Sequence, residues 1–166
     1  GLVDGDMGEK LKQVIPVTNI DLVKQLCSSL DAFLTDIVTE EVDIIGLYIF
    51  SAVWSLGAAL IGSSRAKFDS FIKRVSGEAL PPDSIYEYRY DVSAHRWVKW
   101  EEQVEEYHEP KPFHFYEIMV PTTDSVTYTF LVKNLAPLKP ILFIGESGTA
   151  KTLTIQNYLA SLDPEI

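Results

Sequence analysis

The chain has 166 residues, of which 46% are hydrophobic and 23% charged, and its formal net charge is −10. This length fits one domain or two small pieces, with enough apolar residues for a sizeable core. The acidic balance disfavours a nucleic-acid partner, because no basic stripe is present that could neutralise a phosphate backbone. The single cysteine, Cys27, cannot form an internal disulfide, and its place in an apolar helical pattern favours a small core residue over a nucleophile.

The N-terminal region is predicted to begin with a helix. Residues 1–6 lack the basic start and apolar core of a signal peptide, and the missing initiator methionine is typical of a piece of a longer protein. Thr18 or Asn19 can cap the helix, because both side chains accept hydrogen bonds from free N–H groups of the first turn. Its apolar positions fall on one stripe and are Val23, Leu26, Leu30, Phe33, Leu34 and Ile37.

The next stretch, residues 42–61, is the most apolar part of the chain. No charged residue occurs from Ile44 to Ser64, which is long enough to suggest a membrane span. The alternative is a helix buried in a soluble assembly, which would need apolar cover on all sides. We favour this alternative, since the neighbouring helices are amphipathic and no second span is present.

A third helix is predicted from Arg65 to Arg74, and Gly77 is expected to terminate it. Four of its apolar residues fall on one stripe: Phe68, Phe71, Ile72 and Val75. The first 77 residues therefore indicate a small helical bundle.

An aromatic β-hairpin is predicted after the helix-breaking residues 80–83. Residues 85–90 place three tyrosines on one side of a strand, residues 91–94 form a turn, and residues 95–100 return as a second strand. Cross-strand aromatic pairs would stabilise it. Such a stripe could also stack on nucleic-acid bases, which the acidic surroundings disfavour. His95, His108 and His114 lack metal-ligand spacing and are expected at the surface or in turns.

Residues 101–112 form an acidic, proline-containing connector that is the predicted module boundary. Its acidic residues are Glu101, Glu102, Glu105, Glu106 and Glu109. They fit a solvated linker, and the alternative is a docking surface for a basic partner. Residues 113–120 are expected to be extended. Residues 121–124 then start a helix that runs to Leu135, with Asp124 or a threonine as its cap, and Pro137 and Pro140 end it.

The motif that carries chemistry lies at residues 139–152. The apolar run Ile141–Ile144 is predicted to be a strand buried on both faces, and a glycine-bearing loop, Lys151, Thr152 and a helix over 153–159 follow. Strand, loop, Lys-Thr and helix form the context of a phosphate-binding P-loop. In such a loop the backbone N–H groups bind the anion, the lysine reaches the β- and γ-phosphates, and the hydroxyl of Thr152 holds Mg²⁺.

One position departs from the P-loop pattern. Ala150 stands where the second glycine belongs. Its methyl group is harmless if the residue keeps a negative φ, and otherwise crowds the loop or the phosphate. The alternative interpretation is an ordinary turn before a helix, with an exposed lysine.

Three stretches together resemble the axonemal (ciliary) type of dynein heavy chain. Residues 49–57 and 68–71 resemble the helical small subdomain that closes the second AAA+ module of the motor ring, and residues 85–100 resemble the hairpin after it. Residues 120–128 and the P-loop resemble the start of the third module. The implied fold class is α/β, with a helical bundle, a hairpin and the truncated start of a parallel P-loop domain. The expected domains are 1–79, 80–111 and 112–166.

The resemblance also implies a site for ATP or ADP with Mg²⁺ between neighbouring modules. By this similarity Val120 and Pro121 lie near the adenine, residues 145–149 wrap the phosphates, and Thr152 meets Mg²⁺. The nucleotide-binding residues expected are Val120, Pro121, Gly145, Glu146, Ser147, Gly148, Thr149, Ala150, Lys151 and Thr152. Relatives often have an arginine in place of Thr127 and a glycine in place of Ala150, and both differences bear on how tightly phosphate is held.

We expect no catalytic residue in this chain. Neither Glu146 nor Asp163 ends an apolar strand, so neither can supply the water-orienting acid that ATP hydrolysis requires. The resemblance instead implies a regulatory nucleotide site in an ATP-driven motor that moves on microtubules. Its implied location is the cytoplasm, the cytoskeleton and the ciliary axoneme. Its implied partners are neighbouring AAA+ modules, microtubules and dynein intermediate and light chains, with no nucleic acid or membrane. Two alternatives remain: an unrelated P-loop protein such as a small-molecule kinase, and a structural ring piece whose degenerate loop binds nothing.

Overall fold

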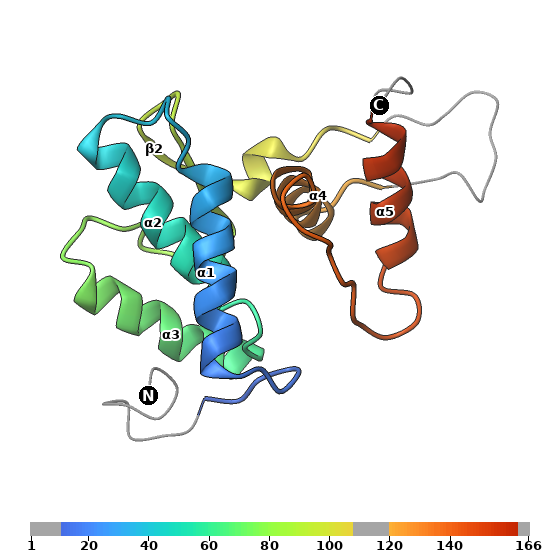
Figure 1. The fold of residues 1–166 in the computed structure, drawn as a ribbon, viewed down its shortest axis with the longest axis horizontal. Helices are drawn as coiled ribbons and strands as arrows, with labels where there is room; N and C mark the ends of the chain where they lie inside the picture. Colours follow the sequence, from blue (N-terminus) through green and yellow to red (C-terminus); the bar gives the residue numbers. More distant parts are fainter. Residues whose placement is uncertain (1–10, 108–119, 163–166) are drawn as a thin grey trace. The chain divides into compact units, whose positions relative to one another are not determined.

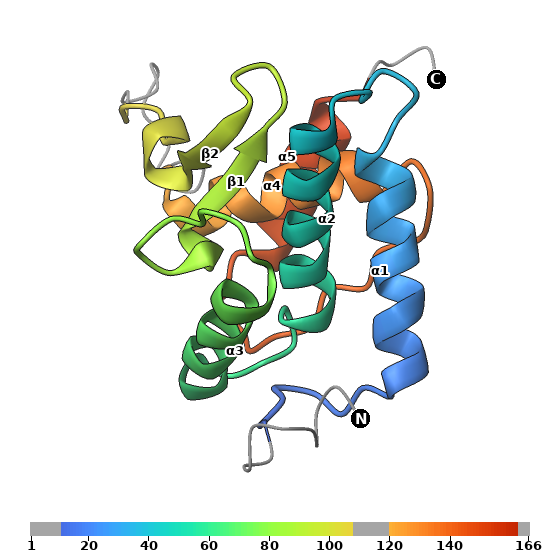
Figure 2. The same ribbon diagram turned by 90° about the vertical axis from the view of Figure 1, so that its left-hand side faces the viewer.

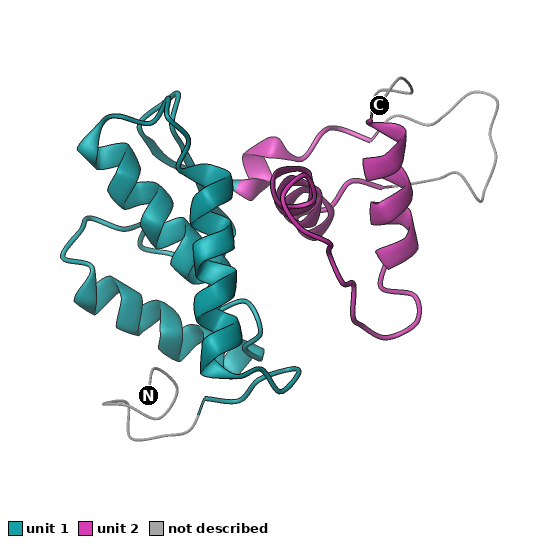
Figure 3. Ribbon diagram, in the orientation of Figure 1, with its two compact units in different colours: residues 1–99 teal, residues 100–166 magenta. Residues whose placement is uncertain are grey.

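The structure, a computed structural model, describes residues 11–107 and 120–162 and divides the chain into two compact units (Figure 3). Residues 1–99 form the first unit and residues 100–166 the second. The first contains α1 (Asn19–Phe33), α2 (Glu41–Leu56), α3 (Gly62–Val75), the 3₁₀ turn η1 (Ile85–Glu87), β1 (Tyr88–Asp91) and β2 (Arg96–Lys99) (Figure 1). The second contains the 3₁₀ turn η2 (Trp100–Gln103), α4 (Thr123–Leu135) and α5 (Lys151–Ala160).

Helix α1 begins where the sequence predicts and ends earlier. Thr18 is the N-cap and forms a capping box with Asp21, which satisfies two free N–H groups. The helix ends at Phe33, so Ile37 lies beyond it and is 87% exposed. Phe33 of the predicted stripe is buried, but at the start of the helix Leu22 is buried and Val23 is exposed.

The prediction of Cys27 as a core residue is wrong. Its side chain is exposed, and the next two residues, Ser28 and Ser29, are buried instead. Small serines at these positions permit the close packing of α1 against α2. Hydrophobic periodicity finds Phe33, which packs edge-on against Phe50 of α2, but does not find the two buried serines.

Helix α2 is shorter than the predicted apolar stretch, because it ends at Leu56. Its middle is buried, with Phe50 2% and Val53 1% exposed. Three apolar residues on α2 remain exposed: Val42, Ile44 and Tyr48. Within the described part of the first unit, α2 is therefore not covered on all sides. Within residues 11–107 and 120–162, no helix has the length and apolar character that crossing a membrane requires.

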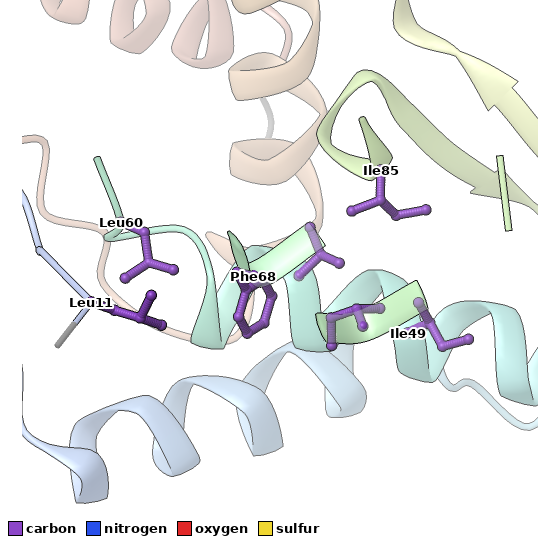
Figure 4. Close-up of a cluster of buried hydrophobic side chains, with 7 residues drawn as sticks. Leu11, Ile49, Leu60, Phe68 and Ile85 are labelled. Carbon is purple, nitrogen blue, oxygen red and sulfur yellow. The ribbon is translucent and has the colours of Figure 1, made fainter. Parts of the chain in front are cut away.

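The core of the first unit lies between α2, α3 and the residues that precede the hairpin (Figure 4). Its buried members are Leu11, Ile49, Val53, Leu60, Phe68, Ile72 and Ile85. Full burial of each large apolar side chain stabilises the fold by roughly 1.5–3 kcal/mol. Helix α3 ends at Val75, which is exposed, and Gly77 follows with φ +70°, which confirms it as the glycine at the helix terminus.

The hairpin is confirmed, with a shorter first strand than predicted (Figure 2). Tyr90 lies opposite Trp97, and their ring centroids are 5.4 Å apart in an edge-to-face contact. Tyr86 is not part of the strand. Asp69 of α3 accepts a hydrogen bond from the backbone N–H of Ile85 at 2.7 Å, which holds the 3₁₀ turn against α3.

The second unit is built on α4. Thr122 is its N-cap and forms a capping box with Ser125, so a threonine caps this helix rather than Asp124. Trp100 of η2 packs edge-on against Phe130 of α4, with centroids 5.3 Å apart, and α4 also packs against α5. Residues 113–119, which were expected to be extended, lie outside the described residues, as do Glu109, His108 and His114. The division at residues 79 and 111 stays a prediction.

Candidate functional site

The segment Ile141–Ile144, predicted to be a buried strand, is not a strand in this chain. The described residues contain no strands except β1 and β2, and Leu142 is 81% exposed. A strand is stabilised by hydrogen bonds to a neighbouring strand, and within the described ranges none lies beside this segment. The expectation is therefore wrong for this chain on its own, because apolar character cannot replace a hydrogen-bonded partner.

The loop that follows has the glycine geometry of the predicted motif. Gly148 has φ +81°, a conformation that costs glycine little and other residues more. Gly145 lies close to other loop atoms. A Cβ at this position would come within 3.1 Å of Thr149 Oγ1 and 3.7 Å of Lys151 Nζ. Gly145 therefore leaves room for these two side chains.

Lys151 folds back into this loop. Its ammonium donates to the carbonyl oxygen of Gly145 at 2.8 Å and to Thr149 Oγ1 at 2.9 Å, and also contacts the carbonyl oxygen of Glu146. The Thr149 hydroxyl in turn donates to the Glu146 carbonyl oxygen at 2.8 Å. The lysine charge thus lies inside the loop, beside the first turn of α5.

Helix α5 begins at this lysine and adds backbone donors. Its first hydrogen bond within the helix runs from the N–H of Thr154 to the carbonyl oxygen of Ala150, at 3.0 Å. The N–H groups of residues 151–153 therefore have no acceptor within the helix and form the partially positive end of its dipole. Free N–H groups and an ammonium beside a glycine loop fit an anion such as phosphate. Thr152 lies in this first turn and is exposed, so a hydroxyl is available beside it.

Ala150 adopts the left-handed conformation that the glycine pattern requires, with φ +55° and ψ 14°. The condition under which its methyl group would be harmless is therefore not met. A left-handed conformation costs an L-residue roughly 1–2 kcal/mol, because Cβ crowds the backbone. Ala150 thus stores strain at the N-cap of α5.

We expect Ala150→Gly to stabilise the second unit by about 0.5–1 kcal/mol, because glycine removes this strain at some cost in unfolded-state entropy. Denaturant unfolding of the two proteins would measure the change. Ala136→Gly is the matched control, because Ala136 has φ −60° and ψ −34° at the end of α4. This control should lose up to about 1 kcal/mol. A loss of stability in Ala150→Gly would contradict the strain at this residue.

The two residues expected near the adenine, Val120 and Pro121, directly precede the N-cap of α4. Val120 is 57% exposed. Among the described residues, no hydrogen bond or ion pair joins either residue to the loop at 145–152. The structure therefore brings together residues 145–151 of the predicted site. It shows no contact between these residues and the two residues expected near the adenine.

Sequence reasoning missed a second polar cluster, in the first unit. Asp43, in the first turn of α2, is 2% exposed. It accepts a hydrogen bond from the Tyr90 hydroxyl at 3.0 Å, and His95 Nδ1 lies 3.0 Å from both of its carboxylate oxygens. Burial and the hydrogen bond to Asp43 raise the pKa of Tyr90 to about 12. The only sequence signal was a carboxylate beside a long apolar run.

This cluster joins α2 to the turn of the hairpin. His95 has φ +51°, so the backbone is strained where its side chain turns toward Asp43. A pocket of about 530 Å³ lies beside it and is lined by apolar residues of α2, by residues 78–82 and by the hairpin. Among the described residues, no group of His, Cys, Asp and Glu could hold a metal ion. The cluster therefore fits a structural role.

Comparison with known families explains both units. Residues 6–102 match the family described as "Dynein heavy chain AAA lid domain", and residues 107–166 match "P-loop containing dynein motor region". The chain belongs to the dynein heavy chain family. The α/β fold class and the expected motor-ring segment are confirmed, and the unrelated P-loop protein is not favoured.

Individual dynein heavy chains align along 69–99% of this chain. It is 39% identical to "Dynein-1-alpha heavy chain, flagellar inner arm I1 complex" of Chlamydomonas reinhardtii and 37% identical to "Dynein axonemal heavy chain 10" of Homo sapiens. Each alignment covers 99% of this chain and 4% of the relative. The human "Dynein axonemal heavy chain 2" is 37% identical over 69% of this chain and 3% of its own length. The chain thus corresponds to a small part of each dynein relative.

Proposed function

We propose that residues 145–152 form the phosphate-binding part of a regulatory ATP or ADP site in a dynein motor ring. The position of Lys151 carries this proposal. Its ammonium lies inside the glycine loop, beside the free N–H groups of α5. Three acceptors around an ammonium are not by themselves distinctive, since Lys73 also has three. What fits phosphate is the place of the lysine beside a glycine loop and a helix N-terminus.

The roles of individual residues follow from their chemistry. Backbone N–H groups of residues 145–149, with that of Ala150, face the phosphates, and Lys151 neutralises their charge. Thr152 supplies the hydroxyl for Mg²⁺, which offsets phosphate charge when it is bound with the nucleotide. Val120 and Pro121 contact the adenine. We also propose the domain division 1–79, 80–111 and 112–166, with the first part closing one AAA+ module and the last part opening the next.

We assign the site a regulatory role, since within the described loop at 145–152 no acidic residue follows a strand from which it could orient water. Glu146 is an exposed loop residue whose carbonyl oxygen accepts from Lys151. Hydrolysis elsewhere in the ring, converted by rigid-body shifts of modules, would drive movement on microtubules. The names of the relatives place them in axonemes and a flagellar inner arm, so we assign this protein to the cytoskeleton of the ciliary axoneme. Its partners are neighbouring modules of the same chain, microtubules, and intermediate and light chains.

A titration tests the proposal in a heavy chain motor region that includes residues 1–166. ADP and Mg-ATP are expected to bind, and adenosine at least about 100-fold more weakly, because charge-assisted contacts to phosphate contribute roughly 1.5–3 kcal/mol each. If the ring contains other nucleotide sites, the Ala150→Asp variant shows which part of the binding signal comes from this loop, since a carboxylate at this position repels phosphate. Equal binding of ADP and adenosine, or an ADP signal that Ala150→Asp leaves unchanged, would refute a phosphate site at this loop.

A further inference from the structure

The Lys151 ammonium has no donor left for a ligand. An ammonium group has three N–H donors. The carbonyl oxygens of Gly145 and Glu146 and the hydroxyl of Thr149 accept all three. A phosphate oxygen can bind this ammonium only if one of these acceptors is released.

Thr149 is the acceptor that is released at the lowest cost. Its hydroxyl donates to the Glu146 carbonyl oxygen at 2.8 Å and keeps that bond when it no longer accepts from Lys151. Release of the Gly145 carbonyl oxygen would remove the one hydrogen bond to that oxygen among the described residues. The Glu146 carbonyl oxygen would keep its bond from Thr149, so between Glu146 and Thr149 the acceptor strength decides. A hydroxyl oxygen is also a weaker acceptor than an amide carbonyl oxygen.

We propose that the Thr149 hydroxyl occupies the phosphate's place on Lys151 in this loop and competes with the nucleotide for the third N–H of the ammonium. Thr149 is thus a positioning residue that lowers the nucleotide affinity of this loop. The two carbonyl oxygens keep Lys151 inside the loop after the exchange, so the ammonium does not need to move far. This inference rests on the proposed nucleotide site and adds a residue that sets its affinity.

Thr149→Val tests the competition, because valine has nearly the same shape and cannot accept a hydrogen bond. We expect it to tighten ADP binding about fivefold, the worth of one net hydrogen bond, and to leave adenosine binding unchanged. Thr149→Ser restores the hydroxyl and should restore the wild-type affinity. Thr154→Val is the matched control, since Thr154 Oγ1 donates to the Ala150 carbonyl oxygen and does not contact Lys151. It should bind ADP like the wild type.

The measurement is the ratio of ADP to adenosine affinity for each protein, with thermal unfolding as a check that each is folded. A structural role of Thr149 would weaken binding, and a bystander would leave the ratio unchanged, so either result in a folded Thr149→Val protein overturns the inference. The proposed nucleotide site survives that result if the wild type still prefers ADP. A wild type that does not distinguish ADP from adenosine overturns both.

Discussion

Replacing Lys151 with alanine is expected to weaken ADP and ATP binding by at least about 100-fold, or roughly 2.7 kcal/mol. The substitution removes the ammonium that lies inside the loop, together with its contacts to the Gly145 carbonyl oxygen and Thr149 Oγ1. It leaves the backbone N–H groups of α5 in place. A charge-assisted contact is worth more than a neutral hydrogen bond, so most phosphate affinity should be lost. Isothermal titration of wild type and variant measures the change.

Lys133→Ala is the matched control, because Lys133 lies exposed in the last turn of α4 within the same unit. It removes the same charge and should leave ADP affinity unchanged. Lys151→Arg adds a stricter comparison, since a planar guanidinium is larger than an ammonium and cannot make the same three contacts. If Lys151→Ala binds ADP like the wild type, the lysine found inside the loop has no role in binding.

The local parts of this fold could be predicted from sequence, because their causes lie within a few residues. The capping boxes at Thr18 and Thr122 are set by side chains three positions apart. Gly77 follows α3 with a positive φ, a conformation that glycine adopts more readily than other residues, so the sequence alone indicates the helix end. The pairing of Tyr90 with Trp97 follows from hairpin register once the turn is placed. In each case one short segment determines the result.

The errors arose where a distant part of the molecule decides the structure. The run at Ile141–Ile144 is apolar enough for a strand, but a ladder needs a partner that pattern alone does not supply. Tyrosine is common in strands, but the Tyr86 hydroxyl donates to the Gly57 carbonyl oxygen at 3.0 Å. The neighbouring backbone N–H of Ile85 is hydrogen-bonded to Asp69 of α3, which holds this segment outside the strand. The burial of Asp43 depends on residues 47 and 52 positions away in the chain.

The candidate site shows the same division between local and distant causes. Spacing predicted that the loop glycines, Lys151 and the start of α5 would lie together, and these contacts are present within residues 145–154. The sequence shows that the sign of φ at Ala150 matters, but it does not predict that φ is positive. The contact between Lys151 and Thr149 was not foreseen, because the pattern assigns Thr149 a backbone role. Which side chains touch within a loop depends on their rotamers, and a sequence motif does not specify these.

Gly46→Val is expected to lower the free energy of unfolding of the first unit by about 3 kcal/mol. Gly46 lies in the interior of α2, where a Cβ atom would come within 2.4 Å of Cδ2 and Cε2 of Tyr90. The ring cannot move aside cheaply, because its hydroxyl is bonded to the buried Asp43 and its edge packs on Trp97. The clash must therefore separate α2 from β1 or break the Tyr90–Asp43 hydrogen bond. Denaturant unfolding followed by tryptophan fluorescence would measure the loss.

Gly62→Val makes the same substitution at the first residue of α3, where a Cβ would have no atom within 4 Å. Valine there gains helix propensity and meets no obstacle, so stability should change by less than about 0.5 kcal/mol. Both variants add the same side chain to a helix, and they differ in whether another side chain already fills the space. A loss below 1 kcal/mol in Gly46→Val would mean that Tyr90 moves freely and that Asp43 does not fix the hairpin on α2.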